Sequence, residues 1–348
     1  MNFKVSTAFV VCVSLAVQSC VTGGPSRSPL TTVKRTQMHM GTLVSITAVG
    51  RTTHEANAAV SAGFQEVKRL EQLLSTWIPD SELSRVNAAA GQSAVRVSPE
   101  TMTVVRKSLQ IAEITDGAFN IAIGPAVDAW NISAEPRLPT SQELAALKPL
   151  IDLHEVHTDG GERTIYLQKP GMRIDVGGIG KGYAADQAVQ VMKKAGAVAG
   201  VVALSGDIKT FGRLPDAGSF TVGIRHPRME GEILAEILLQ DEAISTAGDY
   251  ERFFEKDGVR YHHILDPLTL QPARECQSVS VVAKEGIWAD GLDTGIFVLG
   301  PKRGMELVEH LEDVEAIIVD DAGRLLISSG LRNRVVITSD HPSREHTP

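Results

Sequence analysis

Cysteine and positive charge are both scarce in this sequence. Only 3 of the 348 residues are cysteine, and 42 acidic residues outnumber 34 basic ones, giving a formal net charge of -8. An acidic chain without a lysine and arginine cluster lacks the electrostatic footprint of a nucleic-acid-binding protein. We therefore expect no nucleic-acid partner.

The apolar stretch at the N-terminus is too short for a comfortable membrane span. It has instead the layout of a secretory signal: Lys4, an uncharged stretch from Val5 to Val17, and the small Ser19 before Cys20. The segment ending in Cys20 resembles a bacterial lipoprotein box, in which the cysteine is lipidated and becomes the new N-terminus. A plain exported protein is the alternative. We expect a lipid anchor on the periplasmic side of the inner membrane.

The chain is expected to divide into four parts. These are a signal peptide at 1–19, a flexible Gly/Pro/Ser tether at 20–32, one domain at 33–338 and a disordered tail at 339–348.

Few cysteines also mean that the core must hold the domain together. Cys12 lies in the signal and Cys20 would carry lipid, which leaves Cys276 alone and excludes an internal disulfide. We expect Cys276 to be a buried structural thiol rather than a reactive one.

Hydrophobic periodicity predicts a mixed α+β fold with mainly antiparallel sheets, flanked by helices in two closely packed lobes. Helices are expected at 53–77, at 98–117 after a Ser98 cap, at 144–150, at 181–197 and at 293–312. Strands are expected at 38–50, on both sides of the Pro-Gly turn within 164–178, through much of 198–286, and in hairpins turning at 256–258 and 321–323.

A glycine-rich segment, DVGGIGKGYAAD at 175–186, joins a predicted strand to a helix. Such glycines let a backbone approach a phosphate, and the helix N-terminus would offer free N–H groups. The segment matches neither a Walker A loop nor a Rossmann fingerprint. A tight strand-to-helix turn is an equal alternative.

The segment HHILDP at 262–267 contains two histidines. A histidine can act as a general base near neutral pH. Taken alone, however, the segment favours two ordinary strand residues, one on each face of a sheet.

Two acids stand beside an apolar run in WADGLDTGIFVLG at 288–300. On a helix, Asp290, Asp293 and Thr294 share one face, and their oxygens are hard ligands suited to Mg²⁺ or Ca²⁺. The structural alternative makes Asp290 a helix N-cap with Asp293 in the first turn.

Seven segments together resemble the ApbE family of FAD:protein FMN transferases, in order and in spacing. They are MGT at 40–42, LSTWIPDSELSRVN at 74–87, TDGAFNIAIGP at 115–125, DVGGIGKGYAAD at 175–186, LSGD at 204–207, HILDP at 263–267 and ADGLDTGIFVLG at 289–300. The resemblance implies a Mg²⁺-dependent enzyme that cleaves FAD, attaches FMN through its phosphate to a threonine or serine, and releases AMP. The implied targets are flavin-bearing subunits of membrane redox complexes with a Ser/Thr-Gly-Ala-Ser/Thr type motif.

The resemblance also implies the residues of the site. FAD contacts fall on Met40, Trp77, Ala118, Phe119, Asn120, Asp175, Lys181 and Ile264. The metal set is Asp290, Asp293, Thr294 and the backbone carbonyl of Gly178, and His263 is the candidate base for the target hydroxyl. Two other activities stay open, a Mg²⁺-dependent FAD pyrophosphatase and a non-catalytic flavin-binding lipoprotein.

Overall fold

The computed structural model describes residues 30–214 and 218–338. The predicted signal peptide at 1–19, Cys20 with most of the tether, and the tail at 339–348 lie outside the described residues. Among the residues described, no helix is long and apolar enough to cross a membrane.

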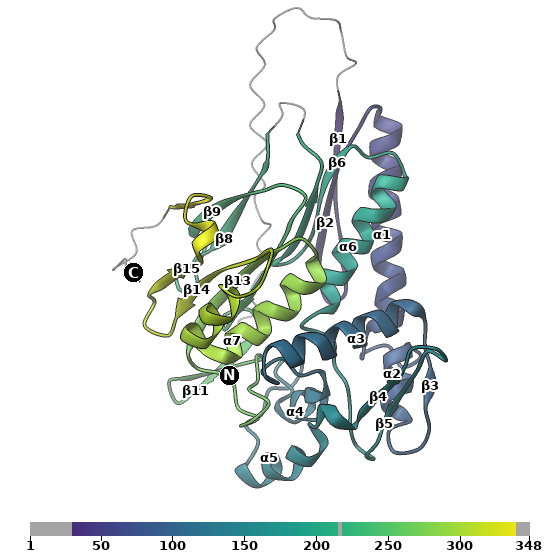
Figure 1. Ribbon diagram of the computed structural model, residues 1–348, viewed down its shortest axis with the longest axis vertical. Coiled ribbons are helices and arrows are strands. Elements are labelled where there is room, and N and C mark those ends of the chain that lie inside the picture. The colour runs from purple at the N-terminus through teal and green to yellow at the C-terminus, as the bar shows by residue number, and fades with distance from the viewer. Residues whose placement is uncertain (1–29, 215–217, 339–348) are drawn as a thin grey trace, which may run out of the picture.

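An eight-stranded antiparallel sheet forms the larger lobe (Figure 1). In spatial order its strands are β1 (Thr31–His39), β2 (Thr42–Gly50), β6 (Ala199–Leu204), β7 (Asp207–Phe211), β10 (Ala243–Gly248), β13 (Cys276–Ala283), β14 (Val314–Asp320) and β15 (Leu325–Ile327).

The two faces of this sheet carry different layers. Helices α1 (Thr53–Leu74), α6 (Gly180–Lys194) and α7 (Gly286–Val308) pack on one face. A three-stranded sheet in the order β16 (Val335–Ile337), β9 (Ile233–Leu239) and β8 (Phe220–Arg225) covers the other. The pleat of β6 explains both contacts, because Val202 and Leu204 join the helix-side core while Val201 and Ala203 join the second core.

The smaller lobe is mainly helical. It contains α2 (Glu82–Ala88), α3 (Pro99–Ile114), α4 (Gly124–Trp130), α5 (Ser141–Leu147) and a small sheet in the order β3 (Val95–Arg96), β5 (Thr164–Leu167) and β4 (Val156–Asp159). A separate hairpin joins β11 (Phe253–Lys256) to β12 (Val259–His262). One continuous core runs through both lobes, from Val44 and Ile46 in β2 to Val104 in α3 and Ile165 in β5. The predicted α+β class with antiparallel sheets is confirmed.

Two strand predictions were wrong. Residues 38–50 are not one strand: β1 and β2 form a hairpin that turns at Met40 and Gly41, and β1 begins at Thr31, inside the predicted tether. The predicted strand after the Pro-Gly turn is also wrong, because no neighbouring strand satisfies its backbone. Asn87 does so instead: its Oδ1 accepts from the Ile174 N–H at 2.8 Å and its Nδ2 donates to the Ile174 carbonyl at 2.9 Å.

Several local predictions are confirmed. Ser98 caps α3, with Pro99 in its first turn. The hairpins turn at Asp257–Gly258 and between β14 and β15 as expected. Cys276 is 3% exposed and its thiol is free, and burial is the main reason that its pKa is raised, so it is a structural thiol.

Helix α7 differs from its prediction at both ends. It begins at Gly286, seven residues before Asp293, and its φ/ψ becomes non-helical at Gly300 (φ 81°), directly before Pro301. A proline removes a helix N–H and clashes with the preceding turn, so the chain kinks there.

Candidate functional site

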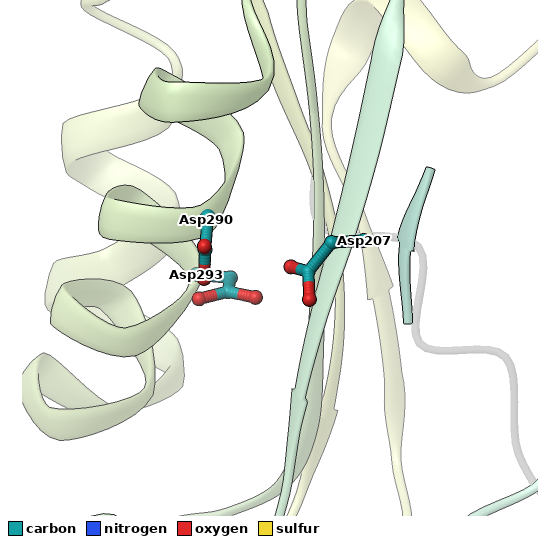
Figure 2. A group of neighbouring side chains, drawn as sticks. All are labelled: Asp207, Asp290 and Asp293. Atoms are coloured by element: carbon teal, nitrogen blue, oxygen red, sulfur yellow. The ribbon is translucent and has the colours of Figure 1, made fainter. Parts of the chain in front are cut away.

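Three buried aspartates meet between the large sheet and α7 (Figure 2). Asp207 is the first residue of β7, whereas Asp290 and Asp293 project from α7 toward it. A carboxylate oxygen from each lies within 4.8 Å of the others. Their exposed fractions are only 3%, 2% and 2%. Buried carboxylates at this separation require a proton, a cation or a metal ion.

The structural alternative for the acids in α7 was wrong. Glu285 occupies the N-cap position and its side chain makes no capping bond, so Gly286–Ala289 form the first turn and Asp290 lies in the second. Asp186 of α6 caps the helix instead, accepting from the N–H groups of Gly286 at 2.8 Å and Ile287 at 3.0 Å. Neither Asp290 nor Asp293 is therefore needed at the helix end, and both are available to the cluster.

Helices α6 and α7 approach backbone to backbone beside the cluster. A Cβ added to Gly182 would lie 2.1 Å from the Gly286 carbonyl oxygen, and one added to Gly286 would lie 2.6 Å from the Gly182 carbonyl oxygen. Only glycine permits this approach. It lets the Gly182 N–H donate to Oδ2 of Asp290 at 2.8 Å, which fixes that carboxylate.

The glycine-rich segment uses its amides inside the protein. The N–H of Gly177 donates to Asp175 Oδ1, and the N–H groups of Ile179 and Gly180 donate to the Val176 carbonyl. With Gly182 bonded to Asp290, these amides are already satisfied. The segment therefore forms a tight turn into α6, and these four N–H groups are not free to bind a phosphate.

Lys181 and Ser245 complete the cluster. The Lys181 ammonium forms an ion pair with Asp207 Oδ2 and lies 3.8 Å from Asp290 Oδ1. The Ser245 hydroxyl contacts Asp207 Oδ1 and lies 2.7 Å from Asp293 Oδ2. One hydroxyl has a single proton to donate, so it cannot satisfy both carboxylates at once.

The electrostatics of the cluster show an excess of negative charge. Burial raises the pKa of Asp290, and the neighbouring Asp207 raises it further. Burial, Asp290 and Asp207 likewise raise the pKa of Asp293. Burial alone would lower the pKa of Lys181, but the charges of Asp207 and Asp290 outweigh it and the pKa is raised. Three carboxyl groups thus share one firmly protonated ammonium, and without a further cation the raised pKa values favour a proton on Asp290 or Asp293.

The structure brings the four predicted metal-site residues together. Thr294 donates from Oγ1 to Asp293 Oδ1 at 3.1 Å. A Cβ on Gly178 would lie 3.0 Å from that same Oγ1, so the glycine-rich turn passes directly over the threonine. The donors are all oxygens and the cluster carries surplus negative charge, which fits a hard cation such as Mg²⁺ or Ca²⁺.

Two residues of the cluster were missed by the sequence reasoning. Asp207 ends the LSGD segment that contributed to the family resemblance, but no role was given to its side chain. Ser245 lies in β10, which pairs with β7 in an antiparallel register that brings it beside Asp207. Only that strand pairing could have identified it.

Some of the predicted FAD-contact residues surround the glycine-rich turn. Met40 has φ 49° in the β1–β2 turn, its N–H donates to Glu71 Oε1 at 2.6 Å, and its Cε lies 4.0 Å from a Cβ placed on Gly180. Phe119 Cε2 lies 3.5 Å from a Cβ placed on Gly178. Both side chains therefore border the segment that leads to the acidic cluster.

The remaining predicted FAD-contact residues differ in their exposure and in whether their side chains are already hydrogen-bonded. Asn120 bonds within the protein, accepting from the Ala122 N–H at 2.8 Å and donating to the Ile151 carbonyl at 3.3 Å. Ala118 precedes Phe119 in the same turn, and Ile264 is 4% exposed. Asp175 binds the Gly177 amide. Trp77 is 73% exposed, which leaves its ring accessible for stacking.

His262 and His263 have different roles in the structure. His262 is a core residue whose Nε2 lies 2.7 Å from the Ala273 carbonyl oxygen and whose Nδ1 accepts from the Ile264 N–H. His263 Nδ1 is buried, and no residue in the described part of the chain forms a hydrogen bond with it. Burial, with the positive charges of Arg252 and Lys181, lowers the pKa of His263 to about 3. The ring is therefore neutral at physiological pH and retains a nitrogen that can accept a proton.

The chain has extensive similarity to known proteins. A model of the ApbE family matches residues 40–318. A Treponema pallidum protein named FAD:protein FMN transferase is 34% identical over 343 residues, which is 94% of each chain. A Klebsiella pneumoniae protein with the same name is 32% identical, covering 80% of this chain and 87% of its own.

Solved structures give the same result. The ApbE protein of Thermotoga maritima superposes with a TM-score of 0.81 at 29% identity, covering 87% of this chain and 99% of its own. The flavin transferase ApbE of Vibrio cholerae superposes with a TM-score of 0.79 at 28% identity, covering 88% and 100%. The matched segment contains the whole acidic cluster and the glycine-rich turn, so this chain belongs to the ApbE family.

Proposed function

We propose that this chain is a Mg²⁺-dependent FAD:protein FMN transferase. The observation that carries the proposal is the buried cluster of Asp207, Asp290 and Asp293, in a chain whose relatives bear that name. In the reaction a bond forms between a hydroxyl oxygen of the target and the FMN phosphorus. The bond from that phosphorus to the oxygen of the AMP phosphate breaks, and FMN remains on the target as a phosphoester.

The acidic cluster supplies the ligands for the metal. Asp290, Asp293 and Thr294, with the backbone carbonyl of Gly178, would hold Mg²⁺, and Asp207 adds negative charge beside them. When bound, Mg²⁺ neutralises pyrophosphate charge and stabilises the charge that develops on the AMP leaving group. The Gly182 amide and Ser245 hydroxyl hold the carboxylates in position, so the site is largely preorganised.

The surrounding residues bind and orient FAD. Met40 and Phe119 flank the glycine-rich turn, and the exposed Trp77 ring offers a stacking surface for a flavin or adenine ring. Ala118, Asn120, Asp175, Lys181 and Ile264 complete the set of proposed contacts. Asn120 serves mainly by holding the shape of its turn, since both ends of its amide are bonded to backbone.

His263 is the proposed general base for the target hydroxyl. A threonine or serine hydroxyl is a weak nucleophile and needs a partner to accept its proton. The Nδ1 of His263, which has no hydrogen-bond partner among the described residues, supports this role as a nitrogen that can accept that proton.

The proposed location follows from the sequence pattern before the domain. The lipoprotein-like segment ending at Cys20 supports a lipid anchor in the bacterial inner membrane, with the enzyme on the periplasmic side. Targets there would be flavin-bearing subunits of membrane redox complexes with a Ser/Thr-Gly-Ala-Ser/Thr type motif. Incorporation of labelled fatty acid into the full chain, and its loss in Cys20→Ala, would support the anchor; equal labelling of both would contradict it.

Chromatographic analysis of nucleotides tests the activity. The enzyme is incubated with FAD, Mg²⁺ and a protein carrying the acceptor motif, with a Thr/Ser→Ala acceptor as the matched control. Transfer predicts AMP release together with flavin that stays on the acceptor after denaturation. AMP accompanied by an equal amount of free FMN, regardless of the acceptor, would show a pyrophosphatase instead. Intact FAD would show a binding protein.

A further inference from the structure

Lys181 lies within the acidic cluster rather than on the surface beside it. Its ammonium is paired with Asp207 and lies 3.8 Å from Asp290 Oδ1, while each of those two side chains is 3% exposed. The Lys181 side chain itself is 25% exposed, so one side of it faces the surroundings of the cluster.

The cluster needs a positive charge even without a metal ion. Three carboxylates share a buried volume, and the Ser245 hydroxyl provides only one proton for two of them. Leaving buried carboxylates without a compensating charge is strongly destabilising. The metal-free protein therefore needs a proton or a cation at these oxygens, and the paired ammonium of Lys181 supplies a cation.

Lys181 is positioned to be that cation, and the nearby buried lysine is not. Lys209 lies two residues after Asp207 in β7, but its Nζ donates to the backbone carbonyls of Asp241, at 3.0 Å, and of Lys284. Lys181 instead pairs directly with the Asp207 carboxylate and lies 3.8 Å from Asp290 Oδ1.

We propose that Lys181 is a built-in counter-charge of the acidic cluster, which stabilises the metal-free protein and limits how tightly a divalent ion binds. This role rests on the proposed function insofar as the cluster binds a divalent ion, and it adds to any contact of Lys181 with FAD. A cation fixed this close to Asp207 and Asp290 repels an incoming ion and competes for the same oxygens.

Removal of the Lys181 ammonium should therefore destabilise the metal-free protein and strengthen its binding of Mg²⁺. In Lys181→Met the metal-free protein keeps three carboxylates without their cation, so its melting temperature should fall by about 5 °C or more. The same change should strengthen Mg²⁺ binding by roughly tenfold or more, because the repulsion is gone. A residue that only contacts FAD would produce neither effect in the absence of FAD.

A second variant keeps the test independent of simple misfolding. Lys181→Met/Asp207→Asn removes one positive and one negative charge and so restores the net charge of the native cluster. Its metal-free melting temperature should recover toward that of the wild type. Lys209→Met is the matched control for loss of a buried lysine, and it should lower stability equally with and without Mg²⁺.

Calorimetric titration of EDTA-treated protein with MgCl₂ alone, together with melting curves, decides the matter. The expected result is tighter Mg²⁺ binding in Lys181→Met, a lower metal-free melting temperature, and recovery in the double variant. Wild-type and Lys181→Met proteins with equal Mg²⁺ affinity and equal metal-free stability would overturn the role of Lys181 while leaving the metal site intact. If neither protein binds Mg²⁺, the proposed metal site itself fails.

Discussion

The backbone amide of Gly182, in the first turn of α6, donates a 2.8 Å hydrogen bond to Oδ2 of Asp290 in α7. A main-chain donor cannot rotate away, so the spacing of the two helices sets the position of this carboxylate. That spacing depends on Gly182 and Gly286, where the backbones meet without side chains between them.

Gly182→Ala should displace α6 from α7. Its new Cβ would lie 2.1 Å from the Gly286 carbonyl oxygen, so the helices must separate, at a cost of about 1–3 kcal/mol of unfolding free energy. Gly180→Ala, two residues earlier, is the matched control, because its Cβ meets nothing closer than 3.7 Å. Chemical denaturation should show a loss only in Gly182→Ala. Equal stability of the two variants would show that the glycine contact does not set the spacing.

Asp207→Asn should weaken Mg²⁺ binding although Asp207 was not among the metal ligands predicted from sequence. The change removes one of three charges that lie within 4.8 Å of one another, and we expect affinity to fall roughly tenfold or more. Asp320→Asn is the control, since Asp320 is equally buried but pairs with Arg324. Calorimetric titration measures both variants. Unchanged affinity in Asp207→Asn would place the ion away from β7.

His263→Ala should slow FMN transfer by about 10²–10⁴-fold if the imidazole accepts the proton of the target hydroxyl. The exposed His157, changed to alanine, serves as the control for loss of a histidine. Initial rates should be measured across pH with saturating FAD and acceptor. A rate near that of the wild type, with an unchanged pH profile, would make His263 a structural residue.

The buried neutral ring of His262 should lower the unfolding free energy of the protein as the pH falls below about 6.5. Burial is the main reason that its pKa is lowered to about 4, whereas the unfolded chain takes up a proton near the ordinary value of 6.5. Its contribution to stability is therefore complete above about pH 6.5 and is lost as the pH falls toward 4, amounting to about 3 kcal/mol. The unfolding free energy should fall less over this range in His262→Gln than in the wild type. Parallel pH curves for the two proteins would contradict the shift.

Local sequence pattern predicts the α7 half of the site and misses the rest. Asp290, Asp293 and Thr294 are close in the chain, so helical periodicity alone places them on one face. Asp207 and Ser245 reach them only because β7 pairs with β10 and α7 packs over both strands. No local pattern encodes that pairing. The family resemblance covered Asp207 through the LSGD segment, but it did not identify the carboxylate as part of the cluster.

Backbone predictions likewise succeed where the signal is local and fail where it depends on residues distant in the chain. Capping residues such as Ser98 and turn residues such as Asp257 and Gly258 act within a few positions, and their predictions are confirmed. The strand expected after the Pro-Gly turn was wrong because Asn87, far away in the chain, satisfies the backbone of Ile174. An apolar alternating segment becomes a strand only where another strand is available to pair with it.

The intact mass of an acceptor protein is the most direct test of the central claim. The enzyme, FAD and Mg²⁺ are incubated with a protein carrying the acceptor motif, and the acceptor is then measured under denaturing conditions. The mass of the acceptor should increase by that of FMN less one water, located on the threonine or serine of the motif. That increase should be absent with Asp293→Asn enzyme or with EDTA. An acceptor of unchanged mass, while FAD is cleaved to free FMN and AMP, would contradict it.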